Sequence, residues 1–126
     1  MTATRFESLS PILAVDDLHQ ALAFYRDLLG FNVAWCWGEP PELAGICRDA
    51  VEMTLMVRTD KPEGRTRVYL RVAGIDALYA NLERADAAIT VPIGDRPYGL
   101  RDFRVVDPDG NELDIGEAIA NQEAAE

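Results

Sequence analysis

The residues that could carry out chemistry are few in this sequence, and they form no familiar catalytic set. His19 is the single histidine, and it stands beside the polar Gln20 in a stretch with helical spacing. A serine or cysteine nucleophile needs a neighbouring base, most often a histidine, to take its proton. We therefore expect His19 to be a surface residue, and we expect no nucleophilic triad and no cofactor.

The two cysteines offer no metal or redox motif. Cys36 and Cys47 lack the Cys-x-x-Cys spacing that is typical of such sites. In a reducing compartment, separated cysteines are more often small buried hydrophobic residues than partners in a disulfide. We expect both to be buried, and we give neither a chemical role.

Aromatic residues offer a different chemistry, which is stacking on planar ligands. Trp35 and Trp37 are two residues apart, so in a strand they share one face and Cys36 takes the other. Two indoles at this spacing can stack on a heteroaromatic group, although filling the core is the commoner role of a strand tryptophan. Tyr98 stands in the predicted loop 94–99, where either ligand binding or anchoring of the loop would explain it.

Length and charge narrow the class of protein. A chain of 126 residues is the size of one domain. The net charge of −10 argues against nucleic-acid binding, and it either favours a cationic ligand or simply keeps the protein soluble. No stretch approaches the ~20 apolar residues of a membrane span, and the first ten residues lack the order of a signal peptide. We expect a cytoplasmic protein that does not contact membranes.

The first half of the chain predicts one strand, one helix and three further strands. Apolar residues recur at helical spacing after Asp16 and Asp17, either of which could cap the helix, and Gly30 ends the run. The predicted elements are a strand at 8–15, a helix at 16–30, and strands at 31–38, 43–48 and 51–58.

The second half repeats this order. A shift of 57 residues aligns Leu13 with Leu70, Val15 with Val72, Leu18 with Ile75, Leu22 with Tyr79, and Tyr25 with Leu82. The predicted later strands are 89–93, 100–106 and 111–117, with a turn at 107–110. This divides one domain, 1–126, into a first module (8–58), a linker (59–65), a second module (66–117) and an acidic tail (118–126).

Each half therefore reads β-α-β-β-β, which predicts an α+β fold of two modules with curved mixed sheets. One face of each sheet takes the helix, and the other needs a second cover. Two such sheets that curl toward each other would enclose a cleft for a ligand.

The motifs LAVDDLHQALAFYRDLLGF and FRVVDPDGNELDI, in this duplicated pattern, resemble the vicinal oxygen chelate superfamily, which includes glyoxalase I, extradiol dioxygenases and bleomycin-resistance proteins. The resemblance covers residues 8–117. ELAGICRDAVEMTLMV, VYLRVAGIDALYANL and the segment Tyr98 to Phe103 are most similar to the bleomycin-resistance branch. That branch implies a small acidic homodimer that binds a cationic glycopeptide at clefts in the subunit interface, without a catalytic metal. Two features depart from it: a tyrosine at position 98, where a tryptophan is usual, and a short segment before it.

The resemblance also implies where a metal would bind in the enzymes of the superfamily. Their ligands, two histidines and a glutamate, match Ser10, Arg67 and Asp114 of this sequence. A hydroxyl, a guanidinium and one shortened carboxylate make a poor site for a divalent cation. We expect no metal here, and we expect Asp114 to be a cleft residue, either paired with Arg67 or solvated. A Mg²⁺ or Mn²⁺ site that uses Asp114 and Glu52 is the alternative.

Strand alternation assigns the residues that face the cleft. If Leu13 and Val15 face the helix, the cleft side carries Ser10, Ile12 and Ala14 in the first module and Arg67, Tyr69 and Arg71 in the second. Phe103 either lines the cleft, as the resemblance implies, or faces a helix. Glu52, Glu112 and Asp114 could add negative charge, while Glu112 and Asp102 could equally lie on solvated edges.

The sequence thus favours a non-catalytic binding protein over an enzyme. It predicts sequestration of a cationic or aromatic small molecule, with a bleomycin-like antibiotic as a candidate and antibiotic resistance as the outcome. The predicted ligand-binding residues are Trp35, Trp37, Glu52, Arg67, Tyr69, Tyr98, Phe103 and Asp114. The alternatives are a metal-dependent lyase, isomerase or dioxygenase of the same superfamily, and a binder of an unrelated hydrophobic or aromatic metabolite.

Overall fold

The structure is a computed structural model that describes residues 3–58 and 64–119. The first module consists of β1 (Ile12–Val15), α1 (Leu18–Leu22), η1 (Ala23–Leu28), β2 (Asn32–Trp37), β3 (Leu43–Arg48) and β4 (Val51–Val57). The second module consists of β5 (Arg67–Arg71), α2 (Ile75–Arg84), β6 (Ala88–Asp95), β7 (Leu100–Val106) and β8 (Glu112–Ala118). Most of the predicted linker and tail falls on residues 59–63 and 120–126, which lie outside the described residues.

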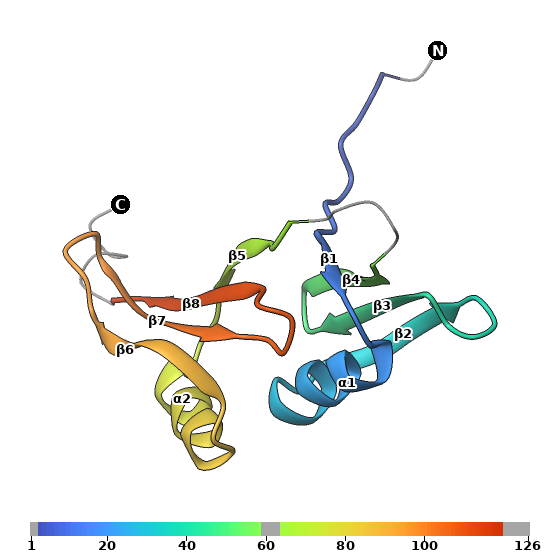
Figure 1. The fold of residues 1–126 in the computed structure, drawn as a ribbon. Helices are drawn as coiled ribbons and strands as arrows, with labels where there is room; N and C mark the ends of the chain where they lie inside the picture. The colour runs from blue at the N-terminus through green and yellow to red at the C-terminus, as the bar shows by residue number, and fades with distance from the viewer. Residues whose placement is uncertain (1–2, 59–63, 120–126) are drawn as a thin grey trace.

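Each module forms one four-stranded mixed sheet. The strand orders are β1-β4-β3-β2 and β5-β8-β7-β6, so the two sheets have the same topology. The first strand of each module pairs in parallel with the last, and the other pairs are antiparallel. Figure 1 shows the two sheets side by side with α1 and α2 beneath them. The predicted α+β duplication is confirmed.

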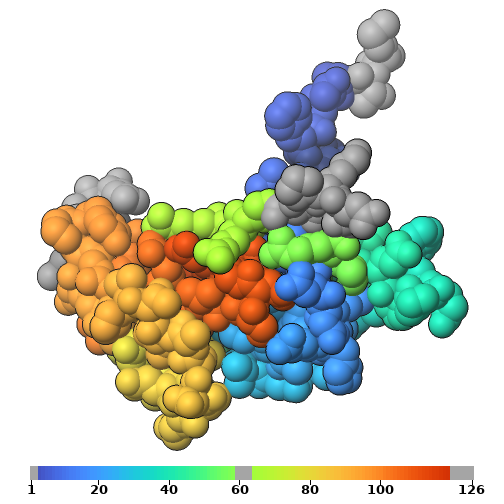
Figure 2. Space-filling model, viewed as in Figure 1, coloured from blue at the N-terminus to red at the C-terminus, as the bar shows by residue number. Residues whose placement is uncertain are grey.

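Three elements differ from the sequence prediction. The first strand begins at Ile12 rather than at residue 8, because Pro11 has no N–H to donate to the ladder. Residues 3–11 instead form an arm that leaves the body of the molecule (Figure 2). The predicted helix 16–30 is α-helical only to Leu22 and continues as the wider π-helix η1. The weakly predicted strand 89–93 is the longer β6, an edge strand with two register shifts that accommodates Pro92.

Asp17 begins the first helix, as the pattern indicated. Its carboxylate accepts a hydrogen bond from the Gln20 amide at 3.2 Å, which satisfies one of the free N–H groups of the first turn. His19 follows on the exposed face of α1, as predicted. No helix among the residues that the structure describes is long and apolar enough to cross a bilayer.

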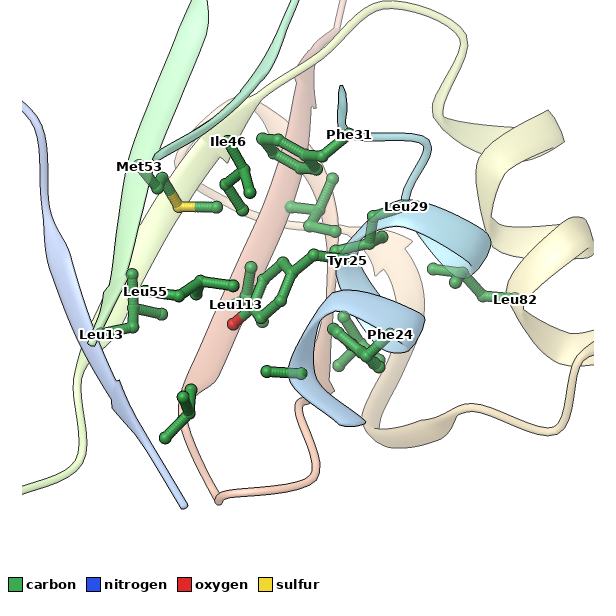
Figure 3. Close-up of a cluster of buried hydrophobic side chains, with 14 of the residues drawn as sticks. Leu13, Phe24, Tyr25, Leu29, Phe31, Ile46, Met53, Leu55, Leu82 and Leu113 are labelled. Atoms are coloured by element: carbon green, nitrogen blue, oxygen red, sulfur yellow. The ribbon is translucent and has the colours of Figure 1, made fainter. Parts of the chain in front are cut away.

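The helix-facing side chains of both modules form one continuous core. Leu13, Leu55, Leu82 and Leu113 are all fully buried in it, although they come from both halves of the chain. Figure 3 shows Tyr25 of η1 at its centre, between the first sheet and the strands of the second. The core therefore lies on the helix side of both sheets.

A buried polar network joins the modules inside this core. The Tyr25 hydroxyl donates to Asp107 Oδ2 at 2.7 Å, and Asn111 Nδ2 donates both to Asp107 Oδ2 and, at 3.0 Å, to the Ala14 carbonyl. Burial, followed by the charge of Asp107, raises the pKa of the Tyr25 phenol, so the hydroxyl keeps its proton. Backbone amides of Asp109 and Asn111 donate to Asp107 Oδ1, so both carboxylate oxygens are satisfied.

We predict that Tyr25→Phe lowers the free energy of unfolding by about 1–3 kcal/mol, because it leaves a buried carboxylate with one donor fewer. Urea denaturation followed by circular dichroism measures this. The matched control is Tyr79→Phe, since Tyr79 packs on Phe103 and its hydroxyl makes no hydrogen bond to a described residue. Equal stability of the two variants would contradict a role of Asp107 in joining the modules.

Candidate ligand-binding surfaces

The first sheet exposes an apolar surface on the side away from its helix. Trp35 and Trp37 pair with Gly45 and Leu43, while Cys36 pairs with the fully buried Ala44. The two indoles therefore share the open face, as strand alternation predicted. We call this surface the indole face, and it consists of Ile12, Trp35, Trp37, Leu43 and Met56.

Gly45 determines how Trp35 lies. A Cβ at Gly45 would overlap the indole of Trp35, so the ring rests against the backbone of β3. Even so, the side chains of Trp35 and Trp37 keep 48% and 63% of their surface exposed. The indoles are thus held by the sheet but not covered, which is the condition for stacking on a planar ligand.

The other predictions for this sheet have mixed outcomes. Ile12 is 55% exposed on the open side, whereas Ala14 is buried and its carbonyl accepts from Asn111. Glu52 is exposed on β4, in register with Cys47. The expectation that both cysteines are buried is wrong: Cys47 is only partly buried, and Cys36 is exposed on β2, whose residues are all exposed.

The second sheet exposes a polar surface that is rich in arginine and tyrosine. Strand alternation places Arg67, Tyr69 and Arg71 on its open side, as predicted, and registers them with Glu112, Asp114 and Gly116. We call this surface the arginine face, and it consists of Arg67, Tyr69, Arg71, Arg96, Tyr98, Asp102, Arg104, Glu112 and Asp114.

Asp114 is paired on this surface, which answers the alternative left open by the sequence. Its Oδ2 accepts from Arg67 Nε and its Oδ1 from Arg104 Nε, both at 2.7 Å. Arg104 Nε also lies 3.2 Å from Glu112. Asp114 is 8% exposed, and a carboxylate so buried needs such partners.

Asp102 accepts hydrogen bonds from three side chains. It was not among the ligand-binding residues predicted from the sequence. Tyr98 and Tyr69 donate to Oδ2 at 2.5 and 2.9 Å, and Arg96 donates to Oδ1 at 2.7 Å. Tyr69 reaches β7 by crossing Gly116, where a Cβ would overlap its hydroxyl. Asp102 is 6% exposed, so the interpretation of it as a solvated edge residue is wrong.

These hydrogen bonds determine the protonation states of Asp102 and of the three residues that donate to it, Tyr69, Arg96 and Tyr98. Burial alone would raise the pKa of Asp102, but the donors Tyr98, Arg96 and Tyr69 outweigh it and the pKa lies below its ordinary value. The hydrogen bond to Asp102 raises the pKa of Tyr98, and burial followed by the same hydrogen bond raises that of Tyr69. At neutral pH the cluster holds one carboxylate, one guanidinium and two neutral phenols.

Phe103 takes the second of its two predicted positions. It is 1% exposed and packs edge-on against Tyr79 of α2, with ring centroids 4.9 Å apart. Its neighbours Asp102 and Arg104 take the open face, so Phe103 must face the helix. It cannot contact a ligand on the arginine face.

The residues at the superfamily's metal positions do not fit a metal ion. The Ser10 hydroxyl lies 3.3 Å from that of Thr54, and Arg67 holds Asp114. Within residues 3–58 and 64–119, no three His, Cys, Asp or Glu side chains form a group that could bind a metal. The Mg²⁺ alternative needs oxygens of Asp114 that are already bonded to guanidinium groups.

The cleft of a single chain lies elsewhere. A groove of about 890 Å³ separates the modules on their helix side, between η1, the β3–β4 turn and α2. Of the predicted ligand-binding residues, none lines it. The indole face and the arginine face are open surfaces because the shared core places the sheets side by side rather than face to face (Figure 1).

The fold is found in several solved structures. The bleomycin-binding protein from Streptomyces verticillus, complexed with copper(II)-bleomycin, is 25% identical with a TM-score of 0.71, over 90% of this chain and 97% of that one. TioX from Micromonospora sp. ML1 is 19% identical with a TM-score of 0.76, over 88% and 99% of the two chains. Lactoylglutathione lyase from Agrobacterium tumefaciens is 21% identical with a TM-score of 0.76, over 94% and 98%.

The last two likenesses establish the fold alone, and no curated protein sequence matches the chain. A family model, by contrast, matches residues 6–115, which include all strands of both sheets except the end of β8. The chain therefore belongs to the Glyoxalase/Bleomycin resistance protein/Dioxygenase superfamily.

Proposed function

We propose that this protein binds a small molecule with a planar aromatic group, without transforming it. The observation that carries this proposal is the pair of indoles on the indole face: Trp35 rests against the backbone at Gly45, and both rings belong to exposed residues in the described part of the chain. Large exposed aromatic surface on a folded protein typically marks a binding site. Binding alone would protect a cell by mass action, which requires the protein to be more abundant than the ligand.

The chemistry of the open faces supports binding rather than catalysis. The superfamily's metal positions carry a hydroxyl and an ion pair, and His19 is exposed on α1, away from both open faces. The phenols of Tyr69 and Tyr98 hold their protons because they donate to Asp102. Neither phenol is thereby prepared to attack a substrate or to take its proton.

A bleomycin-like antibiotic is one candidate ligand. The bleomycin-binding protein that matches this fold supports it. Tyr98 in the loop before β7 is 63% exposed and could add ring surface to the site. An unrelated aromatic metabolite is the alternative, since a shared fold does not fix the ligand.

We further propose that a second copy of the chain covers the open faces. The arm formed by residues 3–11 exposes 97% of Phe6 and 87% of Leu9, and its Ser10 hydroxyl lies 3.3 Å from that of Thr54 on β4. Apolar side chains this exposed are costly in water unless they are buried in an interface. A homodimer would bury them and would convert the open faces into walls of a cleft.

The dimer predicts a measurable mass. Wild-type protein at micromolar concentration should elute as a dimer in size-exclusion chromatography with light scattering, and Phe6→Glu with Leu9→Glu should shift it to a monomer. Thr4→Glu with Ser8→Glu adds the same charge to the same arm without removing apolar surface, and should stay dimeric. A monomeric wild type would exclude this proposal.

Ligand binding predicts a change in tryptophan emission. If the ligand is a bleomycin-like antibiotic, titration with metal-free bleomycin should quench Trp35 and Trp37 and, by calorimetry, show a Kd in the micromolar range or tighter, about −8 kcal/mol. Trp35→Leu and Trp37→Leu should each weaken binding about tenfold or more, as truncated aromatic anchors do.

Val33→Ala is the matched control, because Val33 lies on β2 and pairs with the buried Ile46 on the opposite side of the sheet. It should leave the Kd unchanged. If bleomycin fails to bind at millimolar concentration, the antibiotic is excluded and aromatic probes test the broader proposal. If those probes also leave the indole emission unchanged, the binding function itself is excluded.

A further inference from the structure

The charge of the arginine face differs in sign from that of the whole protein. The chain has a net charge of −10. The arginine face, in contrast, gathers four arginines (Arg67, Arg71, Arg96 and Arg104) and three carboxylates (Asp102, Glu112 and Asp114). The local balance is positive, so the net charge of the chain does not predict the charge of its ligand.

The two buried carboxylates of this face are already bonded to guanidinium and phenol donors. Both oxygens of Asp114 accept from guanidinium groups, and Asp102 accepts from two phenols and from Arg96. A ligand ammonium group would have to approach these carboxylates beside the positive charges of Arg67, Arg96 and Arg104, which repel it. The predicted role of Asp114 as a partner for a cationic ligand is therefore disfavoured.

The arginines, in contrast, keep donors for an anion. Arg67 and Arg104 both use Nε to bind Asp114, and their Nη atoms make no hydrogen bond to a described residue. Arg67 remains 62% exposed. Arg71, in register with Gly116 on the same face, has no hydrogen bond or ion pair among the described residues. A guanidinium with an open Nη edge binds a carboxylate through two parallel hydrogen bonds.

Aromatic surface lies beside these donors. The hydroxyl of Tyr69 is directed across Gly116 to Asp102, where it meets that of Tyr98. Tyr69 and Tyr98 are 42% and 63% exposed, respectively. The face thus offers ring surface next to guanidinium groups, and it presents no phenolate that would repel an anion.

We propose that the ligand is an aromatic carboxylate, whose anionic group binds Arg71, next to Tyr69 on the open face of β5. This inference rests on the proposed binding function and adds the charge of the ligand to it. A single carboxylate matches the single excess positive charge of the face. A phosphate dianion would place more negative charge beside Asp102, Glu112 and Asp114 than the face can neutralise.

The test compares three probes with the same ring and different charge: 2-naphthoate, 2-naphthalenemethanol and 2-naphthylmethylammonium. Calorimetry at pH 7 should give a Kd for 2-naphthoate that is at least about tenfold lower than the Kd for the alcohol. The ammonium probe should have the highest Kd, because only the anion can accept charge-assisted hydrogen bonds from the arginines. Added salt should weaken the binding of 2-naphthoate more than that of the alcohol.

Arg71→Gln should raise the Kd of 2-naphthoate about threefold to tenfold. The fold does not depend on Arg71, since it has no partner among the described residues. Arg84→Gln is the control, because it removes the same charge from an exposed position of α2, where the one hydrogen-bond partner of Arg84 among the described residues is Asn81. It should leave the Kd unchanged.

Two kinds of failure are distinguishable. Equal affinity for 2-naphthoate and the alcohol, strongest binding of the ammonium, or equal effects of Arg71→Gln and Arg84→Gln would overturn the anionic ligand and leave the aromatic binding function intact. Absence of binding for all three probes, with unchanged indole emission, would overturn both.

Discussion

The arrangement of this molecule depends on one buried carboxylate, Asp107. It accepts from Tyr25 of the first module, and through Asn111 it is tied to the Ala14 carbonyl of β1. A charge buried at 4% exposure is tolerated only when its hydrogen bonds are complete, so the network admits one geometry of the two halves. The apolar core around Tyr25 supplies the driving force, and Asp107 supplies the specificity.

That geometry has a consequence for the open faces. Because η1 packs on the helix side of both sheets, the core buries the helix-side face of each sheet. The opposite face of each sheet remains exposed. The two open faces share one feature, which is an aromatic ring that lies across a glycine of the neighbouring strand. Trp35 lies across Gly45, and Tyr69 lies across Gly116. The absence of a Cβ lets the rings lie close to the sheet, where they are fixed in position and still accessible.

Electrostatics separates the two faces. The indole face is apolar, with Glu52 on its last strand, whereas the arginine face holds its carboxylates in guanidinium and phenol hydrogen bonds. In the proposed homodimer, a ligand between the two faces would contact ring surface on one side and hydrogen-bond donors on the other. The net charge of the chain averages over its whole surface, while the composition of each open face follows from which strand positions point outward.

The sequence by itself determined the duplicated β-α-β-β-β order, the strand faces of Trp35 and Trp37, and the unsuitability of Ser10 and Arg67 as metal ligands. These depend on periodicity and residue type, which are local properties. Only the tertiary structure decided that Phe103 is core and that Asp102 is a hub of three donors. Which face a strand turns to its helix, and which side chains from distant strands meet, depend on register and packing between segments that are remote in sequence.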